Sequence, residues 1–122
     1  MKSSEENIIV VKTKSFSVRC VKLYKYLCNK DGNYIIGNQL LRCGTSIGAN
    51  VKEAIRGQSK ADFGSKMNIA LKEASETEYW IEWLRDAGYI SNEQAKSLLD
   101  DCVELIKLLT SIVKSTFISC KS

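Results

Sequence analysis

The apolar positions of this chain recur with the period of an α-helix over four separate stretches. They cover about 15–30, 35–56, 60–87 and 92–117. In the first stretch the apolar side is formed by Phe16, Cys20, Leu23, Tyr24, Leu27 and Cys28. The chain contains no proline, a residue that would interrupt long helices. Four amphipathic helices joined by short turns predict an all-α fold, an antiparallel up-down-up-down four-helix bundle.

Turn and capping signals mark the boundaries between these stretches. Ser59 is a candidate N-cap, with Asp62 three residues later in the first helical turn. Gly88 is a candidate C-cap for the third helix. Ser91 begins the sequence S-N-E-Q, in which Gln94 can reach back to the Ser91 backbone and complete a capping box. The third and fourth helices are therefore predicted to begin just after Ser59 and Ser91.

With 122 residues the chain is long enough for one domain with a real core. We expect residues 1–13 to form a loosely ordered N-terminal segment and residues 14–120 to form the single bundle domain. There is no histidine, and the five cysteines form no CxxC pair. We therefore expect no metal site, no cofactor and free thiols in a reducing cytoplasm. No signal peptide or membrane-spanning segment is visible.

Two glycines lie on the apolar side of the second helix, where they are costly. Gly44 and Gly48 share an arc with Leu40, Cys43 and Ile47. A glycine within a helix costs about 1 kcal/mol relative to alanine. Small residues four positions apart allow a second helix to approach closely. The pattern predicts that a neighbouring helix passes directly over Gly44 and Gly48.

Polar residues border the apolar arcs of the second and third helices. We predict that they meet in a structural network, with Arg42 or Arg85 pairing with Glu53 or Glu78. The predicted network comprises Arg42, Ser46, Asn50, Glu53, Glu78 and Arg85. A contact with a ligand or nucleic acid, or a pair of catalytic carboxylates at Glu53 and Glu78, remains an alternative. Because no catalytic signature is present, we assign no catalytic residue and expect a protein that is not an enzyme.

The third helix has an aromatic side in addition to its core stripe. Tyr79, Trp80 and Trp83 lie away from the stripe that contains Met67 and Ile81. A second apolar surface is typical of a subunit interface, so we predict that these three residues lie in an oligomer interface. The alternative is that the tryptophans lie along the edges of the helix.

Positive charge is concentrated at the start of the chain. Residues 1–30 hold seven Lys and Arg against two acidic residues, whereas the whole chain has a net charge of +4. A basic helix attracts nucleic acid, although it can equally be a solvated surface. The candidate nucleic-acid-binding residues are Lys12, Lys14, Arg19, Lys22 and Lys25. A protein-interaction scaffold that does not bind nucleic acid is the alternative function.

The central sixty residues resemble a known family. The motif "LLRCGTSIGANVKEA" is followed by "GQSKADFGSKMNIALKEASETEYWIEWL". Together they resemble the four-helix bundle proteins of the 23S rRNA intervening-sequence family. The matching positions are Ser46, Ile47, Ala49, Asn50, Val51, Glu53, Ser59, Asp62, Phe63, Ala70, Glu73, Glu76, Thr77, Tyr79 and Trp80. Many members have proline and glycine where this chain has Gly48 and Ala54.

The resemblance implies properties that the pattern of residues does not. It implies a bacterial protein that assembles as a ring-like homopentamer and whose molecular role is largely unassigned. A relative, the accessory variability determinant of diversity-generating retroelements, binds nucleic acid and a reverse transcriptase through a basic surface. The expected partners are therefore other copies of this chain, RNA or DNA, and a nucleic-acid-processing protein. The ribosomal label that some members carry finds no support in this sequence.

Overall fold

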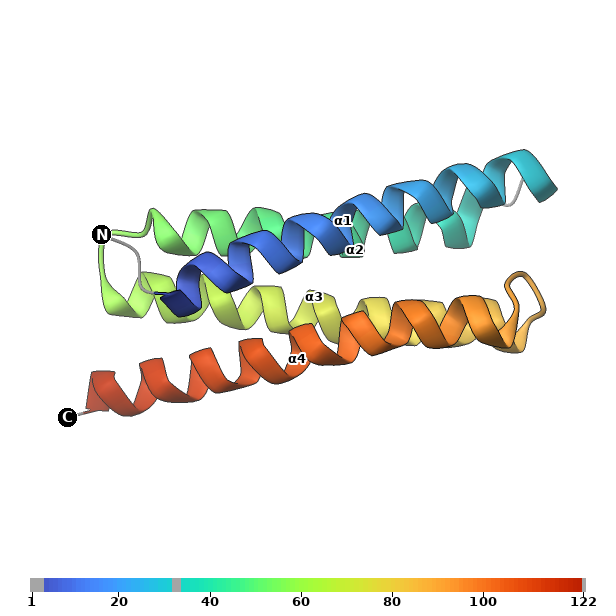
Figure 1. The fold of residues 1–122 in the computed structure, drawn as a ribbon. Helices are drawn as coiled ribbons and strands as arrows, with labels where there is room; N and C mark the ends of the chain where they lie inside the picture. Colours follow the sequence, from blue (N-terminus) through green and yellow to red (C-terminus); the bar gives the residue numbers. More distant parts are fainter. Residues whose placement is uncertain (1–3, 32–33, 122) are drawn as a thin grey trace.

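A computed structural model describes residues 4–31 and 34–121 of the chain, and these residues form four helices. Helix α1 spans Ser4–Asp31, α2 spans Tyr34–Ile55, α3 spans Lys60–Asp86 and α4 spans Asn92–Lys121. Successive helices run in opposite directions, so that α1 begins and α4 ends at the same end of the molecule (Figure 1). No strand occurs in the described part of the chain. The predicted all-α four-helix bundle is confirmed.

The predicted N-caps of α3 and α4 are both present. The Ser59 hydroxyl accepts a hydrogen bond from the Asp62 backbone N–H at 3.1 Å. At the start of α4 the Ser91 N–H donates to the Gln94 side chain at 2.8 Å, and the Gln94 N–H donates to the Ser91 hydroxyl at 3.0 Å. These bonds satisfy N–H groups that the first turn of a helix leaves without a partner.

The end of α3 is a Schellman motif. Ala87 is the C-cap residue, and Gly88 follows it with a φ of +84°. The Tyr89 N–H donates to the Leu84 carbonyl at 2.8 Å, and the Gly88 N–H donates to the Arg85 carbonyl at 3.0 Å. A residue without Cβ adopts this left-handed conformation without strain. Gly88 therefore terminates the helix, although it lies one position after the cap.

The start of α1 differs from the prediction. Residues 1–13 were expected to be loosely ordered, but the helix begins at Ser4. Ile9 and Thr13 are each 1% exposed and extend the core stripe that continues with Phe16. Burial of Ile9 stabilises this first part of the helix by tertiary packing, which does not depend on a capping signal. Residues 1–3 lie outside the described residues, as do residues 32–33 of the predicted turn between the first two helices.

Helix α1 passes directly over the two glycines of α2. A Cβ added to Gly44 would lie 2.5 Å from the Cys20 sulfur and 3.0 Å from the Cys20 Cβ. A Cβ added to Gly48 would lie 3.4 Å from the Thr13 hydroxyl. We call this contact between Gly44, Gly48, Cys20 and Thr13 the glycine seam. The predicted close approach of a neighbouring helix is confirmed.

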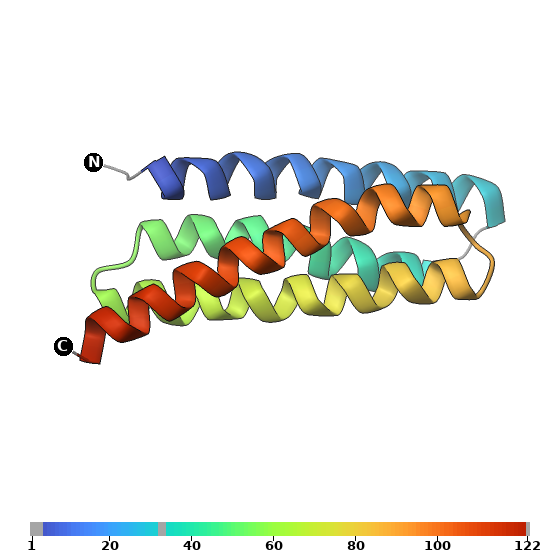
Figure 2. The ribbon, with the colours of Figure 1, turned by 60° about the horizontal axis from the view of Figure 1, so that its bottom comes forward.

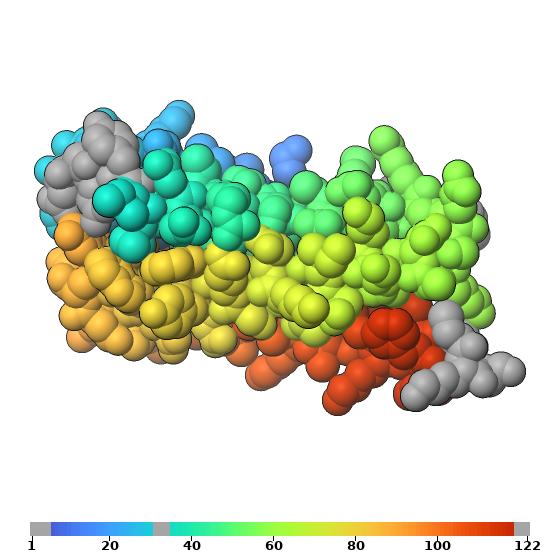
Figure 3. Space-filling view, turned by 180° about the vertical axis from the view of Figure 1, so that it is seen from behind, coloured from blue at the N-terminus to red at the C-terminus, as the bar shows by residue number. Residues whose placement is uncertain are grey.

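The remaining helices pack around one apolar core. Core side chains of all four helices are buried, among them Leu40, Ile81 and Leu109. Helices α2 and α3 lie side by side along the face in Figure 3. Helix α4 lies obliquely across the bundle (Figure 2).

Candidate nucleic-acid interface

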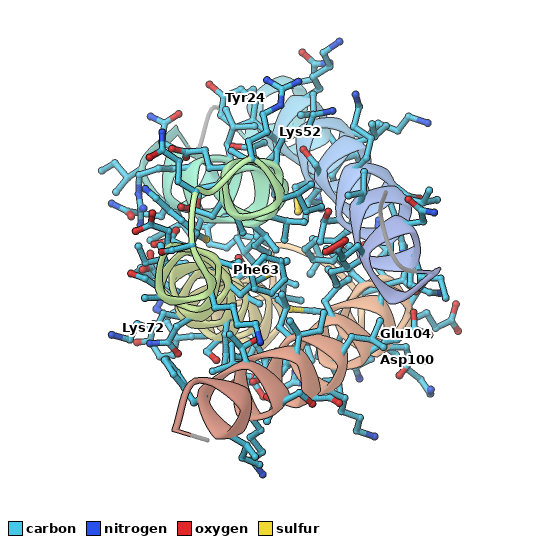
Figure 4. All side chains as sticks on the ribbon, turned by 90° about the vertical axis from the view of Figure 1, so that its left-hand side faces the viewer. Tyr24, Lys52, Phe63, Lys72, Asp100 and Glu104 are labelled. Atoms are coloured by element: carbon cyan, nitrogen blue, oxygen red, sulfur yellow. The ribbon has the colours of Figure 1, made fainter. Side chains whose placement is uncertain are left out.

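The five basic candidates of α1 fall into two groups, and one group is paired with α4. The Lys12 ammonium lies 3.1 Å from the Glu104 carboxylate. The Arg19 guanidinium lies 2.6 Å from the Asp101 carboxylate and donates to the Ser97 side chain at 2.9 Å. Glu104 lies on the side of α4 that is next to α1 (Figure 4). Each carboxylate offsets one positive charge, so Lys12 and Arg19 attract a negatively charged ligand only weakly.

The other group is exposed and has no acidic partner. Lys14, Lys22 and Lys25 are exposed. Within residues 4–31 and 34–121 none of the three forms an ion pair or hydrogen bond through its side chain. Helical geometry places all three on the outer side of α1, opposite the core residues Ile9 and Leu27. This outer side therefore carries positive charges that no acidic side chain of the described residues offsets.

The polar residues of α2 meet α3, but through different partners from those predicted. The Arg42 guanidinium lies 3.3 Å from the Glu73 carboxylate and also pairs with Glu76. The Ser46 hydroxyl donates to Glu73 at 2.7 Å, and the Asn50 amide donates to the Ser46 carbonyl at 2.8 Å. These contacts join α2 to α3 at a half-exposed boundary.

The predicted pairings of Arg42 or Arg85 with Glu53 or Glu78 are wrong. Glu53 instead lies 3.5 Å from the Lys66 ammonium, and Arg85 pairs with the adjacent Asp86 at 2.9 Å. Since Glu73 and Glu76 precede Glu78 on α3, the error is one of register between the two helices. The sequence contained a signal for the true partners, because both glutamates belong to the motif that resembles the family.

Glu53 and Glu78 do not form a carboxylate pair. Glu53 faces Lys66 at the boundary between α2 and α3. Glu78 lies close enough to Cys102 of α4 for its charge to raise the pKa of that thiol, where burial is the larger cause. The two carboxylates thus lie at different boundaries of α3. A two-carboxylate mechanism requires both groups around one bond, and this geometry does not provide that.

The three aromatic candidates are not equally exposed. Tyr79 is 57% exposed, and its ring meets the Trp80 ring edge-on at 5.0 Å. The Trp80 indole N–H donates to Glu76 at 3.3 Å, and Trp83 stacks on Tyr89 at 6.0 Å. Both tryptophans are half-buried against the core, whereas Tyr79 projects from the bundle. Of the three, Tyr79 therefore offers the most apolar surface to a partner.

The buried thiols come from three different helices. Cys20 of α1, Cys43 of α2 and Cys102 of α4 are all buried and free. Burial raises the pKa of Cys20 to about 12 and also raises the pKa of Cys43. Thiols of this kind are protonated and poor metal ligands near neutral pH. No three His, Cys, Asp or Glu side chains of the described residues gather where they could hold a metal ion.

A search of residues 4–31 and 34–121 finds no helix with the length and hydrophobicity that a membrane span needs.

Comparison with known proteins identifies the family. The family model for the 23S rRNA-intervening sequence protein matches residues 5–111. A crystal structure from Bacteroides thetaiotaomicron VPI-5482, described as a protein of unknown function from the S23 ribosomal protein family, has 51% sequence identity. The match covers 90% of this chain and 98% of that chain, with a TM-score of 0.88. A search of curated proteins finds no match. The chain belongs to the 23S rRNA-intervening sequence protein family.

Proposed function

We propose that this member of the 23S rRNA-intervening sequence protein family is a non-enzymatic accessory protein that associates with RNA or DNA in the cytoplasm. The observation that supports this most directly is the outer side of α1, where Lys14, Lys22 and Lys25 are exposed and unpaired in the described structure. Phosphate backbones bind such lysines by releasing condensed counterions. The paired Lys12 and Arg19 have a structural role in this proposal.

Assembly into a homo-oligomer is the second part of the proposal. On α3, Tyr79 is 57% exposed, contacts the Trp80 ring and lines a surface depression together with Trp83. A group of aromatic side chains at the surface is typical of a region that becomes buried in a complex. A ring of subunits, which the family resemblance suggests to be a pentamer, would repeat the basic outer side of α1 in every subunit. Binding to a nucleic-acid strand would then gain from several contacts at once.

Fluorescence anisotropy tests the first part. A labelled single-stranded RNA and a labelled DNA duplex of equal length are titrated with the protein at 50 mM and 200 mM salt. We expect binding at the lower salt that weakens steeply at the higher salt, as counterion release requires. Absence of binding to either probe at 50 mM salt would refute the nucleic-acid proposal. Light scattering tests the second part, because a solution mass of 13.7 kDa would show a monomer.

A protein-interaction scaffold is the second candidate function. The observation that favours it is a surface depression on α3 lined by Tyr79, Glu82, Trp83, Arg85, Asp86 and Ala87, in which Arg85 pairs with Asp86. The two aromatic rings beside the Glu82 carboxylate suit a basic side chain of a partner protein. In the anisotropy experiment this function predicts no binding to either probe at low salt.

A further inference from the structure

A groove runs between α1 and α2 on the outer side of the glycine seam. Lys14 stands on the α1 side of the groove and Lys52 on the α2 side, with Gly48 in the floor between them. Figure 4 shows Lys52 on the part of α2 that is next to α1. The lining includes no acidic residue among those that the structure describes. The groove thus combines two lysines from different helices with a floor of small residues.

The glycine seam determines the shape of this groove. Because Gly48 has no side chain, the α1 backbone approaches to where an added Cβ would lie 3.6 Å from the Thr13 carbonyl carbon. The floor is therefore made of backbone and short side chains. The close approach of α1 and α2 also brings the backbone at Lys14 and at Lys52 near enough for both side chains to contact one ligand. A bulky residue at position 48 would separate these features.

Not every hydroxyl in the groove is available to a ligand. Thr45 donates its hydroxyl hydrogen to the Leu41 carbonyl at 2.6 Å, and Thr13 donates to the Ile9 carbonyl at 2.7 Å. Ser17 has no hydrogen-bond partner within the described residues, and it also lines the groove. The groups that remain able to donate outward are therefore Lys14, Lys52 and Ser17.

We infer that this groove binds the phosphodiester backbone of a nucleic acid, with Lys14, Lys52 and Ser17 donating to phosphate oxygens. The inference rests on the proposed nucleic-acid association and assigns it a site. Two unpaired cations and a free hydroxyl in a lining without described carboxylates complement a chain of phosphates. The described groove lining holds no aromatic side chain on which a base could stack, so binding is independent of sequence.

The test compares two double variants that remove equal charge. Lys14→Gln with Lys52→Gln changes the groove. Lys72→Gln with Lys107→Gln is the matched control, because both residues are exposed on other helices, and Lys72 points away from the groove (Figure 4). Each is measured by anisotropy with two single-stranded RNAs of different sequence, over a series of salt concentrations. Circular dichroism melting confirms that both variants remain folded.

The groove variant is expected to weaken binding of both RNAs alike, by roughly tenfold at low salt. Its plot of log K against log salt is expected to be shallower by about 1.4, the value for two contacts to a single strand. Ser17→Ala removes no charge, so it should lower affinity about two- to fivefold and leave the slope unchanged. The control variant should retain the wild-type affinity to within about twofold.

Three results would overturn the groove assignment while the proposed function stands. They are wild-type affinity in the groove variant, an equal loss in the control variant, and a loss confined to Lys22→Gln with Lys25→Gln. If polyglutamate displaces the RNA as well as unlabelled RNA does at equal charge, the groove recognises carboxylates as readily as phosphodiesters, and the assignment is wrong. If the wild-type protein binds neither RNA at low salt, both the groove and the proposed function fail.

Discussion

Helix α1 meets α2 through small residues and meets α4 through charged ones. On the α2 side, Gly44 and Gly48 let the two backbones approach, and the contact is made by Cys20 and Thr13. On the α4 side, the polar contacts include ion pairs such as Arg19 with Asp101. One helix therefore has a close contact through small residues on one side and a contact through exposed ion pairs on the other.

The difference determines which lysines remain available to a partner. Where acidic residues of α4 are near, the basic side chains of α1 are neutralised, as with Lys12 and Glu104. The α2 residues that line the groove include Lys52 and no acidic residue among those described. No acidic side chain of the described groove lining therefore offsets the positive charge of Lys14. On α1, the basic side chains next to α4 are therefore paired with acidic residues, whereas Lys14, Lys22 and Lys25 are not, within the described residues.

The largest expected effect concerns the thiol at the glycine seam. Burial raises the pKa of Cys20 from 9.0 to about 12. At pH 8 the reactive thiolate fraction then falls from about 10% to about 0.01%, roughly a 1000-fold loss of reactivity. Cys28 lies further along α1 and is only half-buried. Alkylation with iodoacetamide, followed by site-resolved mass spectrometry, should modify Cys28 long before Cys20.

Raising the pH from 7 to 9 should accelerate the labelling of folded Cys20 by about tenfold per pH unit, because the thiolate is the reacting form. In denaturant the two cysteines should react at similar rates, which is the control for intrinsic differences. Equal labelling of Cys20 and Cys28 in the folded protein would show that the seam opens readily.

The second effect is the loss of stability when Gly44 gains a methyl group. In Gly44→Ala the new Cβ would lie 2.5 Å from the Cys20 sulfur, so one side chain or backbone must move. Overpacking costs about 1–3 kcal/mol, and the higher helix propensity of alanine offsets about 1 kcal/mol. We expect a net loss of up to about 2 kcal/mol in the free energy of unfolding, measured by urea denaturation.

A double-mutant cycle attributes this loss to the seam. Cys20→Ala removes the sulfur that the new methyl group would meet. The two substitutions together should therefore destabilise by about 1 kcal/mol less than the sum of the single effects. Additive effects would mean that the strain at Gly44 lies elsewhere.

The contact of α1 with α2 could be predicted from the sequence, whereas its contact with α4 could not. The glycines could be recognised because each violates helix propensity on a buried face, which is a local signal. The caps at Ser59 and Ser91 were predictable for the same reason, since each uses residues within three positions. These features depend on residues a few positions apart along the chain, and the spacing of residues in the sequence shows such relations directly.

Contacts between distant segments were predicted less well. Arg19 and Asp101 are 82 positions apart, and no spacing along α1 indicates that pairing. Arg42 was assigned to a polar strip correctly, but its partners are Glu73 and Glu76 because the register of α2 against α3 is set by core packing. The start of α1 was missed because Ile9 is buried by tertiary contacts, which the local pattern of the sequence does not show.

A third, smaller effect concerns the charged side of α1. Arg19→Ala removes the contacts to Asp101 and Ser97. Because both partners of the ion pair are well exposed, we expect a loss of less than about 1 kcal/mol in the free energy of unfolding. At 1 M salt the difference from wild type should shrink, since screening weakens exposed pairs. A loss above 2 kcal/mol, or one that is unchanged by salt, would mean that the α4 side is packed as tightly as the seam.

The smallest effect is expected at the second glycine of the seam. In Gly48→Ala the new Cβ would lie 3.4 Å from the Thr13 hydroxyl and 3.5 Å from the Thr13 Cβ, which is ordinary contact. No side chain has to move, so the gain in helix propensity dominates and the protein should become about 0.5 kcal/mol more stable. Urea denaturation beside Gly44→Ala measures this on the same helix and the same scale. If Gly44→Ala lowers the free energy of unfolding and Gly48→Ala raises it, the closest contact of the seam is at Cys20. A comparable loss for both variants would mean that the α1 and α2 backbones are equally close along the whole seam.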